Sequence, residues 1–71
     1  MRIESEFMVL VHESTLKPVH VDESVKDFRG DPHIMKGGEA PYRAGSTGRV
    51  HTDRGSFYPG VINCKWVQKK S

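Results

Sequence analysis

The four histidines are the residues of this sequence best suited to holding a metal ion. They stand 8, 13 and 18 positions apart, at His12, His20, His33 and His51. Zinc sites usually contain two ligands a few positions apart in one segment, and the single cysteine, Cys64, has no second thiol with which to form such a pair. The spacing predicts structural or surface histidines, so we expect neither a bound metal nor a cofactor.

Ser46, His51 and Asp53 have the side-chain types of a hydrolytic triad, in which a histidine activates a hydroxyl and a carboxylate orients the ring. Their spacing matches no strand-turn-helix nucleophile motif, and all three fall in or beside one predicted hairpin. We therefore expect a protein that is not an enzyme.

The stretch GSTGR at 45–49 resembles a phosphate-binding loop only in part. Glycines let backbone N–H groups converge on an anion, and Arg49 could bind the same group. The Lys-Ser/Thr ending and the strand-to-helix context of a nucleotide-binding loop are missing. A tight loop that needs glycine for its backbone angles is the better interpretation.

Basic side chains are concentrated in the second half of the chain. Residues 41–71 contain six Lys or Arg and one acidic residue, a net charge of +5, whereas residues 1–40 contain five basic and eight acidic residues, a net charge of −3. This polarity is typical of a protein that binds a macromolecule, and Arg and Tyr suit charged, planar partners. The candidate partner-binding residues are Arg43, Arg49, Arg54, Tyr58, Lys65, Lys69 and Lys70.

A hairpin over residues 48–67, with its turn at 53–55, is predicted to position these side chains. In its returning half Ile62, Cys64 and Trp66 alternate with polar residues, which is the pattern of a strand with one buried face. The alternation also predicts that Cys64 is a buried, unpaired thiol.

Short strands separated by turn residues are predicted for the rest of the chain. Residues 3–12 fit a strand better than a helix because of the run Val-Leu-Val, and Pro18 allows only an edge strand or a loop at 16–21. Further strands are expected at 25–28 and 33–36, and a loop at 39–48.

These elements predict a mainly β fold: one small antiparallel sheet curling toward a barrel, with at most one short helix. We expect Trp66, Phe28, Phe57 and residues 7–11 to fill its centre.

A chain of 71 residues makes one small domain, and we expect residues 1–2 and 68–71 to be loose. The mean hydropathy is −0.59, and the longest apolar run, residues 7–11, is far too short to span a bilayer. No secretory signal pattern follows Met1, because acidic residues come at once. The expected location is the cytoplasm, with no membrane contact, and the oligomeric state is left open.

Several short motifs resemble a recurring pattern of very small bacteriophage-encoded proteins. In order along the chain they are DFRG at 27–30, GGEAP at 37–41, STGRV at 46–50, FYP at 57–59 and KW at 65–66. The likeness covers residues 25–67. It departs from the pattern at 42–45, where YRAG replaces a sequence close to HKPS, and residues 1–24 have no counterpart.

In size and style the chain is similar to phage transcription regulators that bind the host RNA polymerase. The resemblance implies a regulator without enzymatic activity that acts in the host bacterial cytoplasm on transcription initiation or termination, with RNA or DNA as a further contact within that complex. Two alternatives remain open: a nucleic-acid-binding module, and a phage structural or accessory protein. The low total charge of +2 and the acidic first half favour a protein partner over a nucleic acid.

Overall fold

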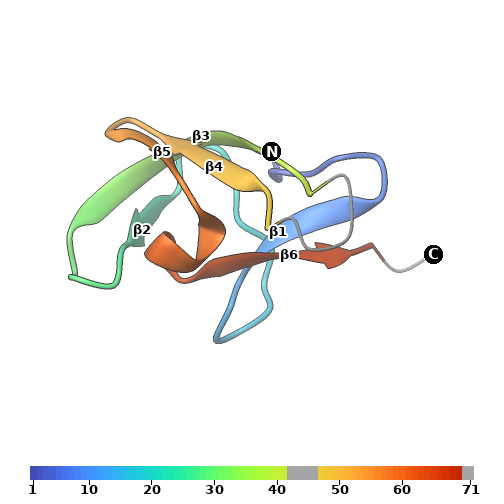
Figure 1. Ribbon diagram of the computed structural model, residues 1–71, viewed down its shortest axis with the longest axis horizontal. Helices are drawn as coiled ribbons and strands as arrows, with labels where there is room; N and C mark the ends of the chain where they lie inside the picture. Colours follow the sequence, from blue (N-terminus) through green and yellow to red (C-terminus); the bar gives the residue numbers. More distant parts are fainter. Residues whose placement is uncertain (42–46, 70–71) are drawn as a thin grey trace.

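The computed structural model describes residues 1–41 and 47–69 of the chain. Within them the elements, in chain order, are β1 (Met8–His12), β2 (Ser24–Lys26), β3 (Pro32–Glu39), β4 (Arg49–Thr52), β5 (Gly55–Phe57), the 3-10 helix η1 (Pro59–Ile62) and β6 (Cys64–Gln68). All neighbouring strands are antiparallel. Figure 1 shows β1 and β6 side by side at one end of the molecule, with the four-stranded sheet β2-β3-β4-β5 at the other.

The predicted mainly β, antiparallel fold with at most one short helix is confirmed. The strands form two sheets rather than one, and in the described part of the chain they do not close into a barrel. The two sheets share one hydrophobic core instead of a continuous hydrogen-bond ladder, because β6 hydrogen-bonds to β1 and not to β4.

The first strand and the turn of the predicted hairpin are confirmed, but its returning strand is β5 and not residues 61–67, which belong to the end of η1 and to β6, the partner of β1. β4 pairs with β5 across the two-residue turn Asp53-Arg54, and the Arg54 backbone N–H donates to the Thr52 hydroxyl oxygen at 3.0 Å. Pro59 then begins η1, since its fixed φ suits a first helical position and it has no N–H for a strand ladder. Asn63, in the left-handed region at φ 58°, ends η1 and redirects the chain into β6.

The core combines residues from both sheets. Its fully buried side chains are Leu10, Met35, Ile62, Val19, Val50 and Cys64. The prediction of a buried Cys64 is confirmed, whereas the prediction that Phe7 and Phe28 fill the centre is wrong: they are 71% and 66% exposed. Phe7 lies in a bend and Phe28 in a turn, both outside the strands, where no sheet face directs them inward.

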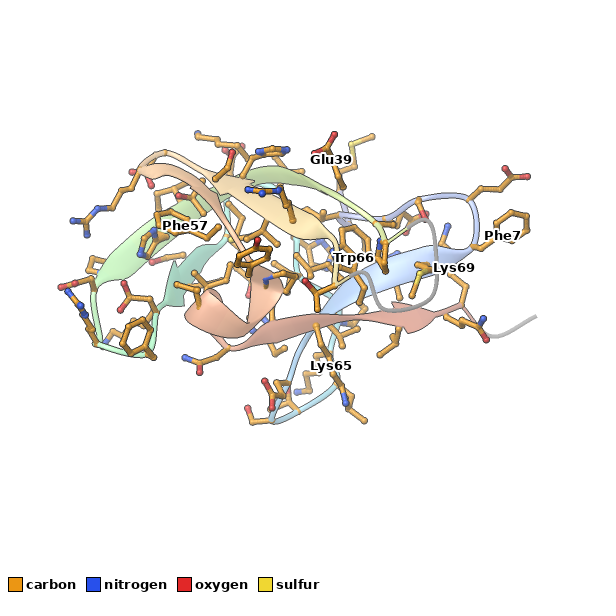
Figure 2. All side chains as sticks on the ribbon, in the orientation of Figure 1. Phe7, Glu39, Phe57, Lys65, Trp66 and Lys69 are labelled. Atoms are coloured by element: carbon orange, nitrogen blue, oxygen red, sulfur yellow. The ribbon has the colours of Figure 1, made fainter. Side chains whose placement is uncertain are left out.

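Trp66 and Phe57, also predicted for the centre, are half-buried at the edge of the core. The indole ring lies against two glycines, and Figure 2 shows it between the two sheets. A β-carbon on Gly38 would come within 3.0 Å of Trp66 Cζ2, and one on Gly48 within 2.9 Å of Trp66 Cδ1. Gly48 also has a φ of +72°, so this loop glycine is required by its backbone angle and by the indole ring.

Backbone hydrogen bonds hold the described residues near both ends. The Val21 N–H donates to Met1 O at 2.8 Å, and the Lys69 N–H donates to Phe7 O at 2.8 Å. The expectation that residues 1–2 and 68–71 are loose stays a prediction, and residues 70–71 lie outside the described part. Across residues 1–41 and 47–69, the structure contains no helix with the length and apolar character needed to cross a bilayer.

We expect Leu10→Ala to lower the free energy of unfolding by about 2–5 kcal/mol, because Leu10 is fully buried and its truncation leaves a cavity. Phe28→Ala should change it by no more than about 0.5 kcal/mol, because the ring is mostly in solvent. Urea unfolding followed by Trp66 fluorescence measures both. Equal losses in the two variants would contradict the observed core.

Candidate functional site

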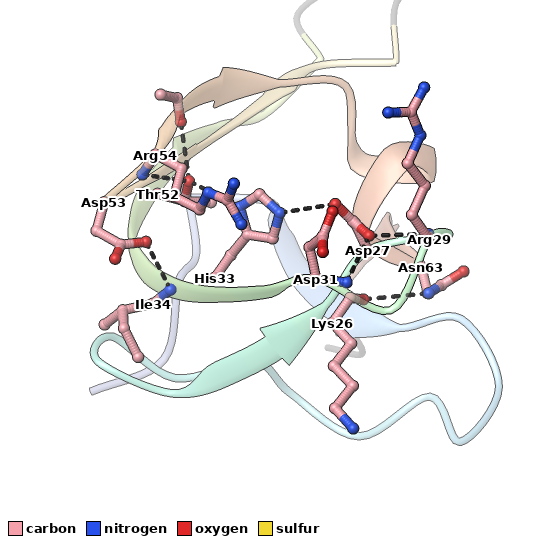
Figure 3. A network of polar contacts seen from close by, with 11 residues as sticks. Lys26, Asp27, Arg29, Asp31, His33, Ile34, Thr52, Asp53, Arg54 and Asn63 are labelled. Atoms are coloured by element: carbon pink, nitrogen blue, oxygen red, sulfur yellow. Dashed lines mark hydrogen bonds and ion pairs between the residues drawn. The ribbon is translucent and has the colours of Figure 1, made fainter.

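A buried histidine connects the turn after β2 with the end of β4 in the four-stranded sheet (Figure 3). His33 on β3 is 3% exposed and donates from Nε2 to Asp27 Oδ2 at 2.9 Å. Its Nδ1 lies 3.3 Å from the hydroxyl oxygen of Thr52, at the end of β4. Asp27 Oδ1 also accepts the backbone N–H groups of Arg29 at 2.8 Å and Asp31 at 3.0 Å, so one carboxylate fixes the turn after β2.

This carboxylate–histidine–hydroxyl arrangement has the residue types of a catalytic triad but not its accessibility. The Thr52 hydroxyl donates to Gly55 O at 3.1 Å, and Thr52 is only 8% exposed. A nucleophile must reach a substrate carbonyl, whereas this oxygen lies in the core and accepts from Arg54. The network ties the β4–β5 turn to the turn after β2.

Two of the three residues singled out as a possible nucleophilic site, His51 and Asp53, have different hydrogen-bond partners. The Asp53 carboxylate accepts the Ile34 N–H at 2.9 Å, and His51 Nδ1 lies 2.7 Å from the Ser56 hydroxyl. Ser46 lies outside the described residues. Asp53 and His51 each have a local structural partner.

The remaining histidine contacts are pairs with single carboxylates. His12 Nε2 lies 2.5 Å from Glu23 Oε2, and His51 Nε2 lies 3.6 Å from Glu39 Oε2. In the part of the chain that the structure describes, no three His, Cys, Asp or Glu side chains form a group able to hold a metal ion.

Arg49 and Tyr58 are the two candidate partner-binding residues that contact each other. The Arg49 guanidinium lies 5.1 Å from the centre of the Tyr58 ring, a cation–π geometry at the open end of the β4–β5 hairpin. Tyr58 is 57% exposed, so the pair presents an ordered cation and an aromatic face to solvent. Arg54 is also exposed but lies in the turn at the opposite end of the hairpin.

Lys65 and Lys69, the described candidates on or next to β6, have different surroundings. Lys65 is exposed, and in Figure 2 it points away from the side of β6 that carries Trp66. Lys69 Nζ lies 3.0 Å from Glu4 Oε1, and the other oxygen of the same carboxylate lies 2.8 Å from Arg2 Nε. The Lys69 hydrogen bond and the Arg2 charge lower the pKa of Glu4, so the Lys69 charge is already compensated within the fold. Arg43 and Lys70 lie outside the described residues.

A groove beside β6 was not predicted from the sequence. It has a volume of about 380 Å³ and is lined by Glu13, Pro41, Thr47, Pro59, Gly60, Cys64, Lys65 and Trp66. The expected pairing of residues 61–67 with β4 would have buried this side of the strand, so sequence reasoning excluded a groove there. The signal that could have found it is Pro59, which ends the hairpin early.

Comparison with protein-family models, curated proteins and solved structures gives no match for this chain. The likeness to bacteriophage regulators therefore stays a prediction from the motifs.

Acid should weaken the fold through Asp27. The hydrogen bond from His33, supported by the N–H groups of Asp31 and Arg29, lowers the pKa of this carboxyl from its ordinary 3.8. A group with a lowered folded-state pKa stabilises the fold above its ordinary pKa, and this stabilisation is lost as the pH falls through the lower value. Urea midpoints measured from neutral pH to about pH 2 should fall more steeply for the wild type than for Asp27→Asn, and parallel curves would contradict this role.

Cys64 should not react while the protein is folded. Burial, reinforced by the negative charges of Glu23 and Glu13, raises the pKa of its thiol to about 12, so almost no thiolate forms near neutral pH. Iodoacetamide should alkylate Cys64 only in denaturant, as followed by intact mass. Rapid alkylation in native buffer would show that the thiol is accessible.

Proposed function

We propose that this protein is a non-enzymatic regulator that binds a larger host protein in the bacterial cytoplasm, with RNA polymerase as the partner, and modulates transcription initiation or termination. The observation that carries the binding role is a set of ordered or exposed cations that the fold itself does not neutralise. The choice of polymerase depends on the phage-like motifs DFRG at 27–30, STGRV at 46–50 and FYP at 57–59.

The basic residues fall into two groups. Arg2, Lys36 and Lys69 form ion pairs with carboxylates of the same chain. Within residues 1–41 and 47–69 the other six form none: Lys17, Lys26 and Arg29 in the acidic first half of the chain, and Arg49, Arg54 and Lys65 in the basic second half. An exposed charge without an internal partner can pair with a carboxylate across an interface and steer association.

A protein partner agrees with the surroundings of these cations better than a nucleic acid does. Glu13 lines the same groove as Lys65, and the Glu39 side chain is 72% exposed beside His51 on the β3–β4 pair. Such carboxylates repel a phosphate backbone, which carries a negative charge at every step. An acidic protein surface can instead place its carboxylates only where they face the cations. Contacts to RNA or DNA within the polymerase complex would then be secondary.

Immobilised wild-type protein should recover RNA polymerase from a bacterial lysate. The variant Arg49→Glu/Arg54→Glu/Lys65→Glu should lose about tenfold or more of this binding, because it places like charges against the acidic partner. A matched control, Lys17→Glu/Lys26→Glu/Arg29→Glu, changes the net charge equally at exposed positions of the first half and should keep binding.

Thermal melts must first show that both variants fold. Absence of every polymerase subunit from the wild-type eluate would remove the proposed partner, and equal recovery by the two variants would remove the proposed surface. Binding of purified duplex DNA with a steep salt dependence, about −0.9 in log–log slope per phosphate contacted, would favour the nucleic-acid alternative.

A further inference from the structure

The outer edge of β6 carries backbone groups that point away from β1. The Leu10 N–H donates to Ile3 O, and Leu10 O accepts the Val19 N–H, both at 2.9 Å, so the Leu10 backbone points away from β6. In an antiparallel pair, residues directly opposite each other either both point their backbone N–H and C=O groups toward each other or both point them away, and the two kinds of pair alternate along the strands. Trp66, opposite Leu10, therefore directs its N–H and C=O away from β1, as do Cys64 and Gln68 two positions on either side.

No hydrogen bond to these N–H and C=O groups is found within residues 1–41 and 47–69. The other edge of β1 differs, since backbone bonds from Ile3, Val19 and Lys17 cover it. The outer strands of the other sheet, β2 and β5, are only three residues long. Cys64 is only 1% exposed, so the part of this edge that solvent can reach is residues 65–68. An accessible strand edge without proline is a template for an added strand, which most proteins protect.

The side chains beside this edge define what such a strand must carry. For an antiparallel strand added to β6, Lys65 and Val67 occupy non-hydrogen-bonded positions, where opposite side chains approach closest. Lys65 is exposed and without an ion-pair partner in the described chain, so a carboxylate belongs opposite it, and an apolar side chain belongs opposite Val67. Trp66, Pro59 and Gly60 line the groove of about 380 Å³ beside the strand, together with Lys65 and the carboxylate of Glu13.

We propose that the outer edge of β6 binds an extended acidic segment of the partner protein as an added antiparallel strand, with an apolar residue and a carboxylate two positions apart. This inference rests on the protein-binding part of the proposed function and not on the identity of the partner. Main-chain hydrogen bonds supply the affinity, while Lys65 and Val67 supply the selectivity.

A second copy of the chain fits this edge less well than an acidic segment. If two β6 strands paired antiparallel about Trp66, Cys64 would face Gln68, and the two Lys65 side chains would lie on one diagonal of the same face. Diagonal neighbours in a sheet are within reach of long side chains, so these two like charges would repel each other.

The test uses the full chain and a labelled peptide of about nine residues in which Val, Thr, Glu and Thr repeat in that order, so that Val and Glu share one face. Fluorescence anisotropy should detect binding of this peptide, and a peptide with Lys in place of each Glu should bind about tenfold or more weakly. Gln68→Pro removes an outward N–H without removing a bond to β1 and should weaken binding about tenfold or more, whereas Gln68→Ala keeps the N–H and should bind as the wild type does.

Amide hydrogen exchange of the wild type with and without the peptide keeps the test decisive if Gln68→Pro fails to fold. The Trp66 and Gln68 amides should exchange more slowly in the complex. The inference is overturned by absence of binding, by equal affinity for the Glu and Lys peptides, by equal affinity of the folded Pro and Ala variants, or by unchanged exchange. A dimer in sedimentation velocity that Gln68→Pro dissociates would also overturn it, in favour of self-pairing.

The two proposals fail separately. Loss of polymerase from the pull-down with peptide binding intact would remove the polymerase and keep the strand-addition site. Recovery of polymerase by Gln68→Pro and Gln68→Ala alike would keep the partner and remove the site.

Discussion

The pairing of β6 with β1 is the contact on which the rest of the structure depends. Pro59 and Asn63 take the chain out of the β4–β5 hairpin through η1, so that the last strand meets the first one instead of β4. This places Leu10, Ile62 and Cys64 in one core with Met35 and Val50 of the other sheet. The same path leaves β6 with a strand partner on one side only within the described residues.

Polar interactions within the fold occupy the side chains of the buried histidine network and the carboxylate of Glu4. His33, Asp27 and Thr52 form hydrogen bonds that hold two turns together. The Glu4 carboxylate forms ion pairs with Arg2 and Lys69. Buried polar groups require such partners, so their presence here is explained by stability. The groups left over, Arg49 with Tyr58 at one end of a hairpin and Lys65 on β6, lie on the surface.

The sequence predicted the fold class and the local elements better than their pairing. Period-two alternation and turn residues identified β4, the turn at Asp53-Arg54 and the buried face of β6, because these are local properties of the chain. The alternation could not indicate which strand β6 pairs with, since that choice depends on the four residues of η1, Pro59–Ile62, which form a 3-10 turn instead of an extended strand. Phe7 and Phe28 were wrongly predicted to lie in the core for a related reason. The backbone of a bend or turn sets the direction of its side chains, and the hydrophobicity of a residue does not predict that direction.

For the candidate site, composition identified the excess of cations, but it could not separate those already paired within the fold from those that are not. Lys65 and Lys69 are equivalent in the sequence, yet Glu4, 65 positions from Lys69, contacts only the second of them. The groove and the outer edge of β6 are products of tertiary pairing, so no sequence signal other than Pro59 pointed to them.

Amide hydrogen exchange of the isolated protein, resolved by NMR along β6, tests the central claim most directly. If β1 is the only strand beside β6, the Lys65, Val67 and Lys69 amides, which point toward β1, should exchange slowly, and those of Trp66 and Gln68 should exchange fast. Slow exchange at all five amides would mean that a second strand already covers the edge, and fast exchange at all five would mean that β6 does not pair with β1. Either pattern would contradict the account.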